Sequence, residues 1–152
     1  MKEKFIFACF ILFGLSAVSQ ESEFLTQFPE IVDGSVSTIA IDEENNRIFV
    51  SGDFDNLRYN EDSNRPFFNS LQTNGGEMTE TIPSVDGAIR KIVGDGMGGK
   101  FIIGDFSQVG NFDRDGLAHL NSENQITALD LKISGIVQDV HLDILKNTLY
   151  VV

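Results

Sequence analysis

The stretch GKFIIGDFSQVG at residues 99–110 decides the fold of this chain. It contains a continuous apolar run at residues 101–103, and such a run is typical of an inner β-strand that is covered on both faces. The run ends in a short tag that also occurs earlier in the chain, after a second apolar run at residues 48–50. The two tags are Gly52-Asp53-Phe54 and Gly104-Asp105-Phe106.

The same order of features occurs three times, which indicates an internal repeat. Each copy starts with an apolar residue, Val36, Ile89 or Val137, and a second apolar run begins 12 residues later in all three. The starts lie 53 and 48 residues apart. Further along, Arg65, Phe67 and Leu71 of the first copy match Arg114, Gly116 and Leu120 of the second.

Each complete copy contains four short β-prone segments separated by polar or glycine-rich turns. We expect strands at 36–41, 48–50, 67–73 and 77–82, and again at 89–95, 100–106, 117–122 and 126–131. Four antiparallel strands in a repeat of about 50 residues are the signature of a β-propeller blade. The prediction is an all-β chain of propeller blades in an incomplete ring, with blades at 36–88 and 89–136, a truncated blade at 137–152, and a lead-in at 20–35.

The second copy, with its continuation RDGLAHLN at residues 114–121, resembles the delta-60 repeat of large secreted bacterial proteins. That family typically shows a Gly-Lys turn, a strand, Gly-Gly-Asp-Phe, a Val-Gly loop, an Arg, and Leu-Ala-Arg-Leu-Asn. The chain departs from it with one Gly before Asp105 and with His at position 119. The resemblance covers residues 36–152 and implies a propeller fold and a secreted context, but no known activity.

The N-terminus has the features of a secretory signal peptide. Lys2 and Lys4 precede an apolar stretch at residues 5–15, and the small residues Ala17 and Ser19 follow at the spacing that signal peptidase requires. The stretch is shorter than the roughly 20 residues of a membrane span. We therefore expect a signal at 1–19, with cleavage after Ser19, and a protein that is secreted or displayed at the cell surface.

Composition excludes several function classes for the processed chain. Its only cysteine lies in the predicted signal, so it has neither a disulfide nor a thiolate nucleophile. The whole chain carries a formal charge of −12, and removal of Lys2, Glu3 and Lys4 makes this −13. Such acidity argues against nucleic acid and anionic lipid as partners, because phosphates demand Lys and Arg. It is compatible with solubility and with cation binding.

The tags have two interpretations. A structural one assigns Gly52 and Gly104 to a bulge or positive φ, Asp53 and Asp105 to acceptance of backbone N–H bonds, and Phe54 and Phe106 to packing between blades. The alternative is a ligand-binding carboxylate in each blade. The structural interpretation is favoured because a repeated tag is what a structural role predicts.

A weaker candidate is a calcium site at Asp113 and Asp115, where two carboxylates lie two residues apart before a glycine. The alternative is a solvated acidic loop, since a hard cation wants about six to eight oxygen ligands. Neither His119 nor His141 belongs to a metal or catalytic motif. We expect no catalytic residue and no required cofactor.

These patterns favour a non-enzymatic extracellular scaffold or interaction module, with an unknown protein or glycan as partner and further blades in the same chain. The alternative is a propeller enzyme, hydrolase or quinoprotein-like, whose site lies in blades outside this sequence. Two and a half blades leave both end faces open. The apolar side chains expected there are Ile39, Ile41, Val140, Leu142, Leu149 and Val151.

Overall fold

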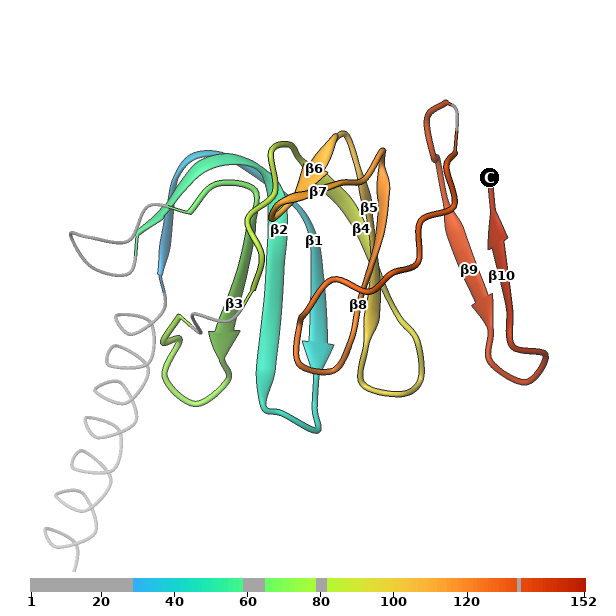
Figure 1. Cartoon of the computed structure of the whole chain (residues 1–152). Helices are drawn as coiled ribbons and strands as arrows, with labels where there is room; N and C mark the ends of the chain where they lie inside the picture. Colours follow the sequence, from blue (N-terminus) through green and yellow to red (C-terminus); the bar gives the residue numbers. More distant parts are fainter. Residues whose placement is uncertain (1–28, 59–64, 79–81, 134) are drawn as a thin grey trace, which may run out of the picture.

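The computed structural model describes residues 29–58, 65–78, 82–133 and 135–152. Within these ranges the chain is all-β and contains no helix, as the sequence predicts. The strands form three antiparallel sheets, which lie in chain order across Figure 1, and one small hairpin. The predicted signal at 1–19 lies outside the described residues.

The first sheet contains β1 (Glu30–Asp42), β2 (Arg47–Arg58) and β3 (Phe68–Gln72), in that order. β1 is rich in β-branched residues, which fit a pleated surface. Both β1 and β2 extend beyond the predicted segments. β1 begins inside the predicted lead-in at 20–35, and β2 runs through the first tag, because the backbones of β1 and β2 stay paired as far as Glu30 and Arg58.

The second sheet contains β4 (Ile89–Gly94), β5 (Lys100–Gly104) and β8 (Leu117–Leu120). Every residue of β5 is buried, which confirms the prediction of an inner strand covered on both faces. Between β5 and β8 the chain forms the small hairpin of β6 (Gln108–Val109) and β7 (Phe112–Asp113). The third sheet contains β9 (Val140–Asp143) and β10 (Thr148–Val151).

The predicted fourth strands at 77–82 and 126–131 are not strands over the residues that the structure describes. Each is reduced to one isolated bridge, between Leu71 and Met78 and between Leu120 and Ile126. The second of these segments is bonded to the sheet at Thr127, whose backbone N–H donates to the carbonyl oxygen of His119 and whose carbonyl oxygen accepts from Arg114 Nη2.

The sheets pack face to face through two apolar clusters. One cluster joins Phe49 and Phe68 of the first sheet to Ile89, Ile102 and other buried residues of the second. The other joins Phe101, Ile103 and Leu117 of the second sheet to Val137 and Val140 of the third segment. Strand β4 contacts β1 on one side and β9 on the other, so the first strands of the three sheets lie next to one another. Ile39 and Ile41 are exposed as the sequence predicts, but Val140 is buried and both Leu142 and Leu149 pack against the second sheet.

The strand pairing shifts the alignment of the second apolar runs in the first two repeats by one residue from the alignment expected from the sequence. In the first sheet Ile39 pairs with Val50, and in the second Ile92 pairs with Ile102, so Phe49 corresponds to Phe101. The 12-residue offset had matched Ile48 with Phe101 instead. The cause is the length of chain between equivalent paired positions: Phe49 follows its partner Ala40 by nine residues, whereas Phe101 follows its partner Val93 by eight. Because side chains alternate between the faces of a strand, a one-residue slip would exchange the two faces.

The tag glycines lie where two backbones approach closely. A Cβ on Gly104 would stand 2.1 Å from the carbonyl oxygen of Ala88, and one on Gly52 would stand 2.1 Å from that of Ser35. Both glycines lie opposite a β-bulge in the first strand of their sheet, as the structural interpretation of the tags expects. A second repeated glycine position, Gly34 within β1 and Gly87 just before β4, lies against the backbone of the tag aspartate and phenylalanine.

Each tag is also bonded to a residue with positive φ that precedes the third strand. Gly104 donates its N–H to the carbonyl oxygen of Gly116, and Gly116 donates to Phe106. Phe67 makes the same two bonds with Gly52 and Phe54. Gly116 and Phe67 have φ of 68° and 64°, which confirms that they match.

Candidate functional site

The two tag carboxylates, Asp53 and Asp105, lie at the surface. Asp105 is exposed, and its Oδ1 lies 3.3 Å from the Nη2 of Arg90 in a surface ion pair. Asp53 is also exposed. The phenylalanines do pack as expected in one respect, because Phe106 is buried in the cluster between the first two sheets. Phe54 is buried as well, but within a cluster of the first sheet alone.

The carboxylate that binds the loop after the second tag belongs to Asp86. It accepts hydrogen bonds from the backbone N–H groups of Ser107 and Gln108 and from the Ser107 hydroxyl, at 2.7 to 2.9 Å. Partial burial raises the pKa of Asp86, but these hydrogen bonds outweigh it and hold the pKa below the ordinary value. The sequence spacing alone did not indicate that Asp86, rather than Asp105, accepts hydrogen bonds from this loop.

We expect Asp86→Ala to lower the free energy of unfolding by about 1–2 kcal/mol, because two loop N–H groups and a hydroxyl lose their acceptor. Asp105→Ala is the matched control and should change it by less than about 0.5 kcal/mol, as is usual for an exposed ion pair. Urea unfolding at neutral pH measures both. Equal losses in the two variants would contradict this assignment of roles.

A second repeated carboxylate, which the sequence interpretation did not identify, lies at the first turn of each unit. Asp42, Asp95 and Asp143 occupy equivalent positions, and each accepts a backbone N–H of its own turn through Oδ1. Their spacings, 53 and 48 residues, are those of the repeat itself. That spacing was the signal by which the sequence could have revealed them.

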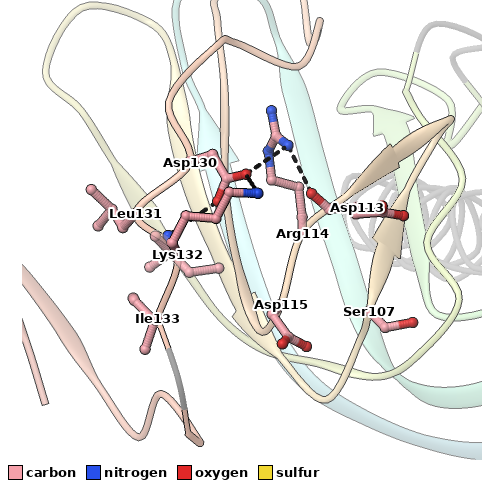
Figure 2. Close-up of a pocket in the computed structure, with 9 residues that line it drawn as sticks. Ser107, Asp113, Arg114, Asp115, Asp130, Leu131, Lys132 and Ile133 are labelled. Atoms are coloured by element: carbon pink, nitrogen blue, oxygen red, sulfur yellow. Dashed lines mark hydrogen bonds and ion pairs between the residues drawn. The ribbon is translucent and has the colours of Figure 1, made fainter.

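The predicted calcium candidates lie at a cavity of about 410 Å³ between the second sheet and the segment that follows it. Figure 2 shows Asp113 and Asp115 at this cavity, with Arg114 between them in the chain. The buried guanidinium of Arg114 lies 3.5 Å from Asp130 Oδ2, which also accepts from Lys132 Nζ at 2.6 Å. The carboxylate of Asp130 is therefore already paired with two cations.

No group of three or more His, Cys, Asp or Glu side chains is arranged to hold a metal ion within the described ranges. Asp113 and Asp115 are both exposed, and the cationic side chains of Arg114 and Lys132 line the same cavity. The arrangement fits a polar cavity stabilised by ion pairs better than a site for a hard cation, which wants several converging oxygens.

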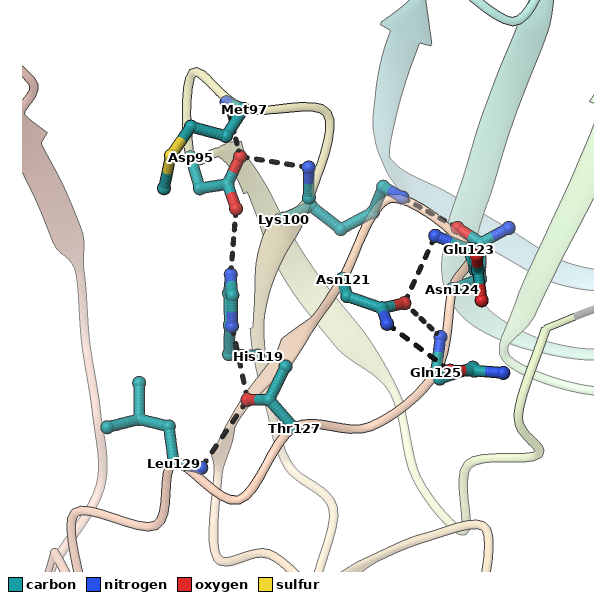
Figure 3. A network of polar contacts seen from close by, with 11 residues as sticks. Asp95, Met97, Lys100, His119, Asn121, Glu123, Asn124, Gln125, Thr127 and Leu129 are labelled. Carbon is teal, nitrogen blue, oxygen red and sulfur yellow. Dashed lines mark hydrogen bonds and ion pairs between the residues drawn. The ribbon is translucent and has the colours of Figure 1, made fainter.

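A polar network connects the turn before β5 to the segment after β8 (Figure 3). His119 Nε2 lies 3.0 Å from Asp95 Oδ2, and its Nδ1 lies 3.1 Å from Thr127 Oγ1. The ring also lies against Phe101, with 4.5 Å between centroids. His119 is half-buried within β8, in agreement with the sequence interpretation of it as a strand residue.

A carboxylate, a histidine and a hydroxyl in this order are the groups that nucleophilic catalysis uses. Here, however, Thr127 Oγ1 also accepts from the backbone N–H of Leu129, and Asp95 is bonded to two N–H groups of its own turn. None of the three residues lines the cavity of Figure 2. The hydrogen bonds of His119 therefore connect the turn before β5 to the segment after β8.

The same turn leads into a buried lysine. Lys100 Nζ donates to Asn124 Oδ1 at 2.6 Å and lies 4.1 Å from the centre of the Phe49 ring on the first sheet. Burial lowers the pKa of Lys100 to about 8; the carboxylates of Asp42 and Asp95 oppose this, and the charge of Arg47 adds to it. Lys100 also lines a cavity of about 350 Å³ between the first two sheets.

Stability should therefore rise with pH above about 8. The folded chain releases the Lys100 proton near pH 8, whereas the unfolded chain keeps it up to about 10.5, so the unfolded state binds more protons in this window. We expect urea unfolding to show a rise that is absent in Lys100→Met. The control Lys91→Met, at a half-exposed lysine of β4, should keep it. An unchanged rise in Lys100→Met would contradict the assignment.

No helix among the described residues is long and apolar enough to cross a membrane. Comparisons of the chain with protein-family models, with curated proteins and with solved structures each gave no match.

Proposed function

We propose that the chain is part of a secreted β-propeller of the delta-60 repeat type and that it serves as a non-enzymatic scaffold or interaction module. One observation carries the proposal. The first two units repeat one set of landmarks, the third shares their turn aspartate, and the three sheets pack face to face with their first strands side by side. Propeller blades pack in this way around an axis.

The landmarks that support the repeat are backbone features as well as side chains. The first two units share a bulge opposite the tag glycine and a positive-φ residue bonded to the tag. All three share the turn aspartate at Asp42, Asp95 and Asp143. A stack of like units in which each contacts its neighbours is the architecture of repeat proteins.

Duplication of the second unit tests the repeat architecture. A variant with a second copy of residues 89–136 inserted after residue 136 should unfold cooperatively, with a larger urea m-value, because the added unit buries surface against its neighbours. The reference is the full chain without the insertion. An insertion that leaves the m-value unchanged, or that adds a separate unfolding transition, would argue against stacked equivalent units.

Secretion and the interaction role need their own experiments. Expression of the full chain in a secreting bacterial host should release a product whose mass corresponds to a start at Gln20. Immobilised protein should then bind one glycan or extracellular protein saturably and release it chemically unchanged. Chemical conversion of the bound molecule would instead support the enzyme alternative.

A further inference from the structure

The turn after β3 contains the only Asn-Gly pair of the sequence, Asn74-Gly75. Two backbone hydrogen bonds close this turn: Gly76 donates its N–H to the carbonyl oxygen of Gln72, and Gln72 donates its own N–H to that of Glu77. Asn74 is exposed, and a Cβ on Gly75 would meet nothing within 4 Å. The space around the peptide bond that joins the two residues is therefore open.

The reactive groups of this pair are also free of hydrogen bonds. Among the residues that the structure describes, the side-chain amide of Asn74 has no hydrogen-bond partner and the backbone N–H of Gly75 has no acceptor. Nothing in the described part of the fold therefore holds the amide carbon of Asn74 away from the Gly75 nitrogen.

Two other asparagines, Asn69 and Asn121, precede a small residue, in both cases a serine, but the fold holds their side chains in place. Asn69 is fully buried in β3, and its Nδ2 donates to the carbonyl oxygen of Arg65 at 2.9 Å. The Oδ1 of Asn121 accepts from the backbone N–H groups of Glu123 and Gln125 (Figure 3). Within the described ranges, only the asparagine of the Asn-Gly pair combines exposure, an unbonded amide and a following glycine.

We propose that Asn74 is a site of spontaneous deamidation in the folded chain. The backbone nitrogen of Gly75 attacks the side-chain Cγ of Asn74, and the new N–C bond closes a five-membered succinimide ring. The C–N bond of the side-chain amide breaks, and ammonia leaves with the proton of the Gly75 nitrogen. Glycine suits this step because it has no Cβ to shield the nitrogen or to restrict the backbone.

Water completes the reaction by adding to either carbonyl group of the ring. One addition leaves aspartate at position 74, and the other leaves isoaspartate, in which the main chain runs through the former side chain. Each product adds one negative charge to a chain whose formal charge is −12. The isoaspartate product also lengthens the main chain inside the hydrogen bond from Gly76 to Gln72.

Peptide mass spectrometry of the full chain, incubated in the folded state at mildly alkaline pH, tests the proposal. The mass gain that accompanies conversion of an amide to an acid should appear at Asn74 before it appears at Asn69 or Asn121. Gly75→Ala should lose most of this gain over the same incubation, because its methyl group shields the nitrogen. Gly94→Ala is the matched control, since a Cβ there also meets nothing within 4 Å, and it should react like the wild type.

A parallel incubation in urea separates the effect of the fold from that of the sequence. Unfolding should speed deamidation of Asn69, which loses its burial and its hydrogen bond, while Asn74 reacts in both samples. The proposal is wrong if Asn74 gains mass only in urea, because the fold would then protect it. It is also wrong if Asn69 reacts as early as Asn74 in the folded chain, or if Gly75→Ala reacts as fast as the wild type.

Discussion

Phe49→Ala should destabilise the chain by about 3–5 kcal/mol, the range for removal of a buried aromatic side chain. Phe49 is buried in the cluster between the first two sheets, where its ring stacks on Phe68 at 5.9 Å between ring centroids and lies 4.1 Å from the Lys100 ammonium of the second sheet. The substitution leaves a cavity between two sheets and removes the ring beneath a buried cation.

Small domains are stable by only about 5–15 kcal/mol, so this loss should move the urea midpoint far toward zero. Leu145→Ala, at an exposed turn residue, is the control and should stay within about 0.5 kcal/mol of the wild type. A loss below about 1 kcal/mol in Phe49→Ala would mean that the first two sheets are not joined through this residue.

Gly104→Ala should also be strongly destabilising, by at least about 2 kcal/mol, because there is no room for a methyl group. The new Cβ would stand 2.1 Å from the Ala88 carbonyl oxygen and 2.8 Å from the Ile89 Cα, and both are backbone atoms that cannot rotate away. To relieve the clash, β4 and β5 would have to separate at the bulge.

Gly94→Ala provides a matched control in the neighbouring strand, since a Cβ there meets nothing within 4 Å. It should be neutral or stabilise the chain by up to about 1 kcal/mol through the unfolded state. Thermal or urea unfolding measures the stability of the two variants. Similar stability of Gly104→Ala and Gly94→Ala would contradict the close approach of the strands.

Much of the fold follows from short-range patterns that the sequence displays directly. The apolar run of β5, the burial of Phe106 and the match of Phe67 with Gly116 were all predicted, because the apolar run and the tag recur in the first two copies. The register between the first and second strands of each unit was predicted less well. The offset between equivalent strand partners is one residue smaller in the second unit than in the first, which changes the face that Phe101 occupies, and residue types alone do not reveal this offset.

The hydrogen-bonding roles of the polar side chains were the hardest feature to predict from the sequence. Asp86, Asp95 and Asp105 are all aspartates next to glycines, and only geometry shows which carboxylates accept backbone N–H groups. The prediction of a fourth strand in each unit was wrong for a related reason. Arg114 and His119 bond to Thr127, so polar contacts hold a segment that β-propensity had suggested would pair as a strand.

The stacking of equivalent units is tested most directly by methyl-to-aromatic nuclear Overhauser effects in the full chain. The account predicts cross-peaks from the Phe49 ring to methyl groups of the second sheet, such as those of Ile102, and from the Phe101 ring to the methyl groups of Val140. Both pairs connect residues that lie far apart in the sequence and in different sheets. Cross-peaks from Phe49 and Phe101 confined to their own sheets would contradict the account.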